Sequence, residues 1–238
     1  MSNVLKLFKG EITRLIKYKI LFFSLLVSSI WVLFIALVSK TEAIMFIPFL
    51  IIMDDALMSI VFLATSFFYE KQEGIAKTLL VAPVSVTQIL ISKVAASLFT
   101  GVISLVIIAL SSLIFHGIII NWGLALIYMF AAVFAHTAIG YLVILASKDF
   151  MGFIVRFMVV IIILILPTIF IALGIIPTSY DYIGILSPTY AAQLLVDSLF
   201  KSVDWWKVLL ASVYLFGIGA LIFPVFVIKK YQRFALEG

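Results

Sequence analysis

The sequence contains no cysteine and only two histidines in 238 residues. Without cysteine there is no disulfide framework, no thiol nucleophile and no thiolate metal site. Two histidines are too few for a histidine-rich metal centre. Charge is also scarce, because Asp, Glu, Lys and Arg make up 11% of the chain, against about 25% in a typical soluble domain. Low charge combined with high hydrophobicity excludes a disordered chain and nearly excludes a soluble enzyme.

Hydrophobic residues make up most of the chain. The chain is 66% hydrophobic and 15% aromatic, with 22 phenylalanines, and its mean hydropathy is +1.34. A transmembrane helix needs about 20 apolar residues to cross a hydrocarbon core of about 30 Å. The long Ile, Leu, Val and Phe runs therefore predict an all-α polytopic membrane protein that forms a single domain over residues 1–238. The predicted spans are 20–38, 43–68, 94–115, 122–146, 153–175 and 206–228.

Basic residues follow one side of this topology. Of the 16 Lys and Arg residues, 13 fall in the N-terminal segment, in the loops that follow spans two and four, and in the C-terminal segment. The other three, Lys40, Lys201 and Lys207, lie on the opposite side of the predicted topology. Because cytoplasmic loops carry the excess of Lys and Arg, both termini are predicted to lie in the cytoplasm of a prokaryotic plasma membrane. The net charge of +5 then sits beside anionic lipid, which leaves no case for nucleic acid.

Two segments outside the spans carry helical patterns. Residues 4–19 place Val4, Phe8, Ile12 and Leu15 on one face and lysines on another, as in a helix lying in the headgroup layer. The alternative is a basic flank with no further role. Residues 176–205 form a long outer segment, in which Ser187 and the following proline begin a predicted helix over 188–200.

The second cytoplasmic segment, residues 68–93, is the most informative. Charge begins at Glu70, Gly74 offers a bend, and Pro83 breaks any helix that precedes it. Ser85 or Thr87 then caps the helix that enters the third span. The pattern predicts a short helix parallel to the membrane with a break on each side, which can transmit motion from a cytoplasmic partner. An ordinary interfacial loop is the alternative.

The same stretch resembles the hallmark of ABC-2 type transporter permeases. It reads Glu-Lys-Gln-Glu-Gly from residue 70, Leu-Leu-Val-Ala-Pro-Val-Ser from residue 79, and Ser-Lys at 92–93. Ile75 departs from the pattern, because many relatives have threonine there. The six spans, the basic N-terminal elbow and the long outer segment before span six also match. Within the family the chain most resembles drug-export permeases of the fluoroquinolone-export type.

The resemblance implies a permease subunit of an ATP-binding cassette exporter. Such a subunit forms half of a substrate pathway, pairs with a second permease chain as a homodimer or with a related permease, and is driven by a separate ATPase. The sequence has no G-x-x-x-x-G-K-[ST] phosphate loop, so this chain is expected to be no enzyme and to hold no cofactor, with ATP and magnesium on the partner. The residues assigned to ATPase coupling are Glu70, Glu73, Gly74, Leu79, Leu80, Pro83 and Lys93.

Within that assignment, Leu79 and Leu80 are expected to insert into a groove of the ATPase. Glu70 and Glu73 are expected to hold the end of span two against basic or amide groups. The expected cargo is a drug-like or other amphipathic compound.

Three polar residues interrupt the spans. Asp54 and Asp55 lie about 21 Å above the end of span two, and a mid-membrane aspartate costs roughly 2.5–3.5 kcal/mol. They line either a polar substrate path or the outer headgroup level. His136 in span four is either hydrogen-bonded between helices or part of a proton relay. An alternative function is therefore a proton-coupled secondary transporter that uses Asp54, Asp55 and His136, although no inverted repeat is visible.

Overall fold

A computed structural model describes residues 2–231, and within these residues the chain forms helices and no strands. This confirms the predicted all-α class. The elements are α1 (Asn3–Lys17), α2 (Ile20–Leu37), α3 (Lys40–Ile51), η1 (Ile52–Leu57), α4 (Met58–Gln72), α5 (Ile75–Val81), α6 (Val86–His116), α7 (Trp122–Leu145), α8 (Phe150–Ala172), η2 (Thr178–Leu186), α9 (Pro188–Asp197), α10 (Trp205–Ile222) and η3 (Phe223–Val227).

Six helical stretches are long and apolar enough to cross a membrane, as predicted. The helices of the second, third and sixth spans extend beyond the predicted membrane-crossing segments. The second span runs without a break through α3, η1 and α4 over 33 residues, and α6 has 31 residues. Glu70 and Lys93 suggested ends near 68 and 94, but both side chains are buried inside the protein. Because each charge is paired internally, neither ends its helix.

Local signals explain the other helix ends. Ser39 and Glu42 form a capping box at the start of α3, and Ser85 and Gln88 form one at the start of α6. Span five ends at Ala172, three residues before its predicted end, because Gly174 takes a left-handed conformation with φ of 71°.

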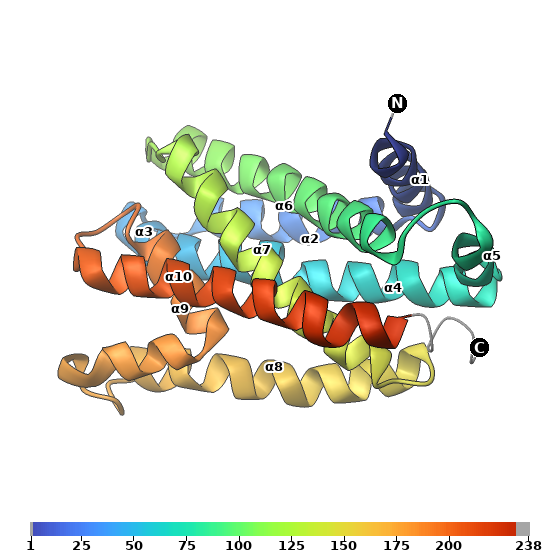
Figure 1. Ribbon diagram of the computed structural model, residues 1–238. Coiled ribbons are helices and arrows are strands. Elements are labelled where there is room, and N and C mark those ends of the chain that lie inside the picture. Colours follow the sequence, from blue (N-terminus) through green and yellow to red (C-terminus); the bar gives the residue numbers. More distant parts are fainter. Residues whose placement is uncertain (1, 232–238) are drawn as a thin grey trace.

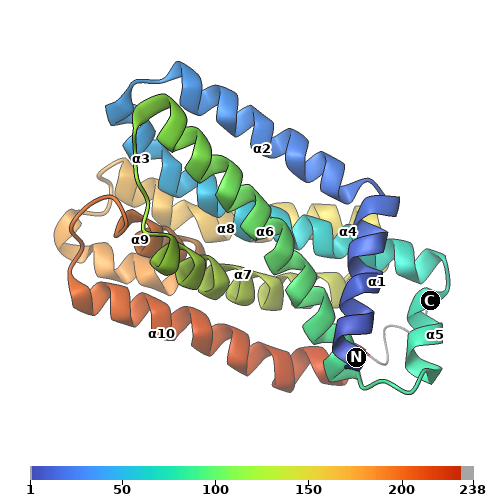
Figure 2. The same cartoon turned by 90° about the horizontal axis from the view of Figure 1, so that it is seen from above.

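The spans run side by side, and the shorter helices cover their two ends (Figure 1). At one end, α1 and α5 lie across the spans, as Figure 2 shows. At the other end, α3 begins and α9 packs among α7, α8 and α10. α8 lies along one side of the bundle and leaves most of its apolar residues exposed.

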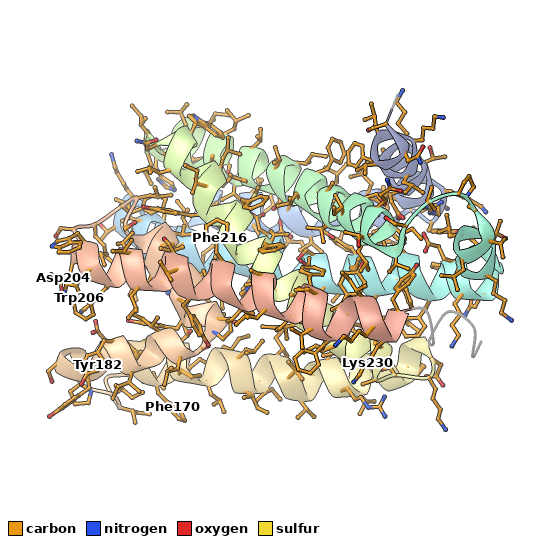
Figure 3. All side chains as sticks on the ribbon, viewed as in Figure 1. Phe170, Tyr182, Asp204, Trp206, Phe216 and Lys230 are labelled. Atoms are coloured by element: carbon orange, nitrogen blue, oxygen red, sulfur yellow. The ribbon has the colours of Figure 1, made fainter. Side chains whose placement is uncertain are left out.

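The charge asymmetry follows this division. Figure 3 places Asp204 and Trp206 at one end of the sixth span and Lys230 at the other. Lys230 shares its end with α1 and α5, where the sequence places nearly all its basic residues. Arg233, one of the residues in that count, lies outside the described part of the chain. The basic end is thus the end that carries the predicted coupling segment.

Candidate functional sites

The predicted short helix of the second cytoplasmic segment is present as α5. Gly74 precedes it with a φ of 73°, a left-handed conformation that glycine adopts readily. Ala82 follows with extended backbone, and Pro83 comes next. These breaks separate α5 from both α4 and α6, so seven residues stand as an independent element at the basic end of the bundle.

α5 presents a mixed surface. Leu79 and Leu80 are half-buried and pack against the apolar cluster formed by α4, α6, α7 and α8. Val81 is 85% exposed, and Lys77 and Thr78 are exposed beside it. The insertion of Leu79 and Leu80 into an ATPase stays a prediction. Because both already contact this chain, Val81 is the apolar side chain of α5 most available to a partner.

Glu73, at the end of α4, links the second span to the N-terminal helix. Its carboxylate accepts hydrogen bonds from the Lys17 ammonium at 2.9 and 3.0 Å and from the Tyr18 hydroxyl at 2.8 Å. These bonds lower the pKa of Glu73. Partial burial, together with the hydrogen bond to Glu73, raises the pKa of Tyr18 to about 12. Tyr18 also stacks on Tyr69, with ring centroids 4.5 Å apart.

Glu70 belongs to a buried cluster of four charges, which we call the charge cluster: Glu11, Arg14, Glu70 and Lys93. Lys93 Nζ lies 2.6 Å from Glu70 and 2.9 Å from Glu11. Arg14 lies 2.8 Å from Glu70 and 2.7 Å from Glu11. Two cations thus alternate with two carboxylates, and the cluster joins α1, α4 and α6.

The charge cluster is an internal structure. The side chains of Glu70 and Lys93 have no exposed surface, and that of Glu11 is 3% exposed. Although burial opposes ionisation, the ion pairs with Lys93 and Arg14 lower the pKa of Glu11. Glu70 and Lys93 therefore hold the start of α6 and the end of α4 against α1. Any contact that they make with an ATPase stays a prediction.

Sequence reasoning missed Glu11 and Arg14. One signal was available, because Glu11 is the single acidic residue in a helix that is otherwise basic. It lies on the same face as Phe8, Ile12 and Leu15, which pack against the bundle. An acid on the packed face of a basic helix indicates a buried partner for its charge, and here the partners are Arg14 and Lys93.

Asp54 and Asp55 lie in η1, a π-helical stretch in the middle of the second span. Their residues are 4% and 1% exposed. One oxygen of Asp54 accepts hydrogen bonds from the hydroxyls of Ser28, at 2.6 Å, and Ser104. Neither oxygen of Asp55 has a hydrogen-bond partner among the described residues. The pair is thus inside the bundle and far from either end of a 33-residue helix, a position that does not favour the headgroup-level alternative.

His136 connects two helices. Its Nδ1 donates to the Ala132 carbonyl at 2.8 Å, so Nε2 accepts from the Thr189 hydroxyl of α9 at 3.2 Å. Both ring nitrogens are engaged, and the residue is fully buried. This geometry fits the interhelical hydrogen bond, and Asp54 and Asp55 are not among the partners of the ring.

No group of three or more His, Asp or Glu side chains able to hold a metal ion occurs in residues 2–231. Three buried polar sites of the described chain are the charge cluster, the aspartate pair of Asp54 and Asp55, and the histidine bridge between His136 and Thr189.

Six apolar spans, with a basic helix and a separate short helix across one end, define a polytopic membrane domain. The family model described as "ABC-2 family transporter protein" matches residues 44–228, and the chain belongs to this family. The resemblance drawn from the sequence is confirmed at this level. No curated protein matches the chain.

Proposed function

We propose that the chain is the permease subunit of an ABC exporter and forms half of the substrate pathway. Membership of the ABC-2 family supports a membrane permease. A separate ATPase is expected to supply the energy, since the sequence has no phosphate loop of its own. A second permease chain is expected to complete the pathway, as a homodimer or with a related permease.

The observation that carries the proposal is the placement of α5. The helix projects at the basic end, lies across the spans, and is joined to α4 and α6 by a left-handed glycine and a proline-containing break. A rigid element of this kind can carry a push from a cytoplasmic protein into two spans at once. Its attachment to the bundle through Leu79 and Leu80 favours such transmission.

A drug-like or amphipathic cargo is supported by one groove. It has a volume of about 590 Å³ and lies among α6, α7 and α10. Its lining is almost entirely apolar and includes Phe130, Phe134 and Phe223. A groove of this composition favours an apolar or amphipathic compound over a sugar chain.

We further propose that α1 and α5 face the cytoplasm of a prokaryotic cell. The support is the gathering of basic residues at their end of the bundle, with Trp206 at the opposite end. A reporter that is active only outside the cytoplasm should stay silent when fused after residue 238. An active reporter would overturn the orientation.

ATPase docking is tested with two matched variants. Val81→Asp places a charge on the exposed tip of α5, whereas Ile119→Asp changes an equally exposed residue, at 83%, at the opposite end of the bundle. Tagged protein is purified from native membranes, and the ATP hydrolysis that co-purifies is measured. We expect Val81→Asp to lose most of this activity, because a docked charge would be buried unpaired, and Ile119→Asp to keep it. Equal activity in both variants would sink the docking proposal.

A further inference from the structure

The carboxyl group of Asp55 has neither a cationic partner nor a hydrogen-bond partner among the described residues. It is 1% exposed, and neither of its oxygens has a hydrogen-bond partner among the described residues. Ser104 lies beside both aspartates, but its hydroxyl is committed to Asp54. An ionised carboxylate in this position would be buried without a partner, which proteins avoid at high cost.

No cation of the chain reaches the pair within residues 2–231. η1 packs against α3, α4, α6, α7 and α9, and Ser28 of α2 contacts Asp54. The buried ionisable side chains of those elements are Glu70, Lys93, His136, Tyr141 and Tyr190. No ion pair between described residues includes Asp54 or Asp55.

Asp54 and Asp55 also differ from each other. One oxygen of Asp54 accepts from two hydroxyl groups, an arrangement suited to a carboxylate. Asp55 receives no such donors. The other oxygen of Asp54 also has no hydrogen-bond partner among the described residues, but Asp55 has none on either oxygen. Asp55 is therefore the carboxyl with the greater need for a neutralising species, and that species must be small, because the residue is closed from the surface.

Buried polar side chains on one face of α6 lie between this position and the basic end of the bundle. On α6, the buried residues Lys93, Ser97, Thr100 and Ser104 follow one another at helical spacing. Between the charge cluster and Thr100 lies a small cavity of about 10 Å³, lined by Glu11, Ser66, Ser97 and other residues. A cavity of that size is close to the space that one water molecule needs.

The route also has an entrance. A pocket of about 210 Å³ at the basic end is lined by Lys6, Gly10, Arg14 and other residues of α1, together with Val84. Arg14 contacts Glu11, and Glu11 borders the small cavity. Ser104 lies one turn beyond Thr100, about 6 Å along the helix axis, and bonds directly to Asp54.

We propose that Asp55 is a proton-binding site that exchanges with the cytoplasm along Ser97, Thr100 and Ser104. A proton from cytoplasmic water adds to one oxygen of the Asp55 carboxylate and forms a carboxylic acid. The donor is a hydronium ion, one of whose O–H bonds breaks to leave water, and the negative charge of the aspartate pair falls by one. The site is independent of the proposed ATPase and cargo, because every residue that it uses belongs to this chain.

The test uses the full chain in lipid nanodiscs and infrared detection of the protonated carboxyl band. At neutral pH we expect a carboxylic C=O band that Asp55→Asn removes and that the exposed control Asp149→Asn leaves unchanged. Asp55→Glu keeps an acid in place and should retain a band at a shifted frequency, which guards against loss through misfolding. Spectra in which Asp55→Asn removes no band would overturn the proposal.

The second arm separates a proton from a metal cation. At constant pH, replacing potassium chloride with sodium chloride should leave the band unchanged. A band that sodium abolishes would show that sodium displaces the proton, and it would overturn a site that binds protons alone.

The third arm tests the route by the rate at which the band shifts after transfer to deuterium oxide. Ser97→Ala and Thr100→Val should slow that shift by about tenfold each, the effect of one lost hydrogen bond on the barrier. The control is Ser111→Ala, which changes another buried serine of α6 beyond Ser104. Equal rates in all variants would overturn the route.

Discussion

Two buried acidic sites within this bundle are built in opposite ways. In the charge cluster, Glu11 and Glu70 each meet both Arg14 and Lys93 at salt-bridge distance. At the aspartate pair, the described neighbours of the carboxyls are two serine hydroxyls, and both serve Asp54. The two sites share nearly complete burial and differ in how their negative charge is balanced.

The charge cluster is neutralised by side chains of the same protein, whereas the neutralisation of the aspartate pair depends on conditions outside it. A buried charge needs compensation, and the charge cluster takes it from cations on α1 and α6 that cannot leave. The cluster therefore fastens three elements permanently at the end that carries α5. The aspartate pair has no such cation in the described chain, so its compensation must come from outside and can vary with conditions.

Lys93→Met tests the fastened site and should have the largest effect. The change removes one cation and leaves two carboxylates facing each other across α1 and α4. Breaking a buried ion pair in this way costs about 3–5 kcal/mol. Thermal unfolding of the detergent-solubilised chain should therefore show a large drop in midpoint.

The matched control removes the excess charge as well. Glu70→Gln combined with Lys93→Met restores the balance between Glu11 and Arg14, so the double variant should recover much of the lost stability. A single variant as stable as the unmodified protein would show that the cluster contributes little.

The aspartates should respond differently from the cluster and from each other. Asp54→Ala removes the acceptor of two buried hydroxyls, Ser28 and Ser104. We expect a loss of about 1–3 kcal/mol, because buried donors lose their partner. Asp55→Asn removes no hydrogen bond between described residues and should leave the unfolding midpoint nearly unchanged. A larger loss for Asp55→Asn than for Asp54→Ala, in parallel thermal unfolding, would contradict the assignment of roles.

Much of the fold was readable because it rests on hydropathy. A run of 20 apolar residues has few alternatives to a membrane-spanning helix, and glycine and proline around α5 mark breaks by their backbone restrictions. The predicted spans stop beside Glu70 and Lys93, whereas α4 and α6 continue past these residues. A charge predicts the end of a span only when it faces water, and here each charge meets an opposite charge from a distant element.

The sites were less predictable for the same physical reason. The sequence identified Asp54, Asp55 and His136 as unusual residues, but their partners are Ser28, Ser104 and Thr189. Small hydroxyl residues are common in apolar helices and carry no local signal. Which of them faces an acid depends on how three or more helices pack, and neither periodicity nor spacing contains that information.

The histidine bridge provides an intermediate case with no net charge. His136→Phe removes the hydrogen bond between α7 and α9 while keeping an aromatic ring, and Thr189→Val removes the other partner. Each single variant should lose about 1 kcal/mol. The double variant should lose less than the sum of the two, since both remove the same bond. Additive losses in thermal unfolding would show that His136 and Thr189 act separately.

The smallest effect is expected at Tyr18, whose hydroxyl bonds to the exposed carboxylate of Glu73. The pKa of Tyr18 is raised to about 12 from an ordinary value of 10.0, so folding favours the protonated hydroxyl. This contribution to stability is fully present below pH 10 and is lost as the pH rises through about 12.

Ultraviolet titration of the protein should show a late ionisation of Tyr18, which is isolated by subtracting the titration of the Tyr18→Phe variant. The Glu73→Ala variant should move this ionisation toward lower pH. The shift should be partial, because burial also raises the pKa of Tyr18 and this variant keeps most of it. Removing the hydrogen bond at this exposed position should leave the bundle folded, because the charge cluster, and not Glu73, holds α1 against the spans. An unchanged titration in Glu73→Ala would mean that burial alone sets the ionisation of Tyr18.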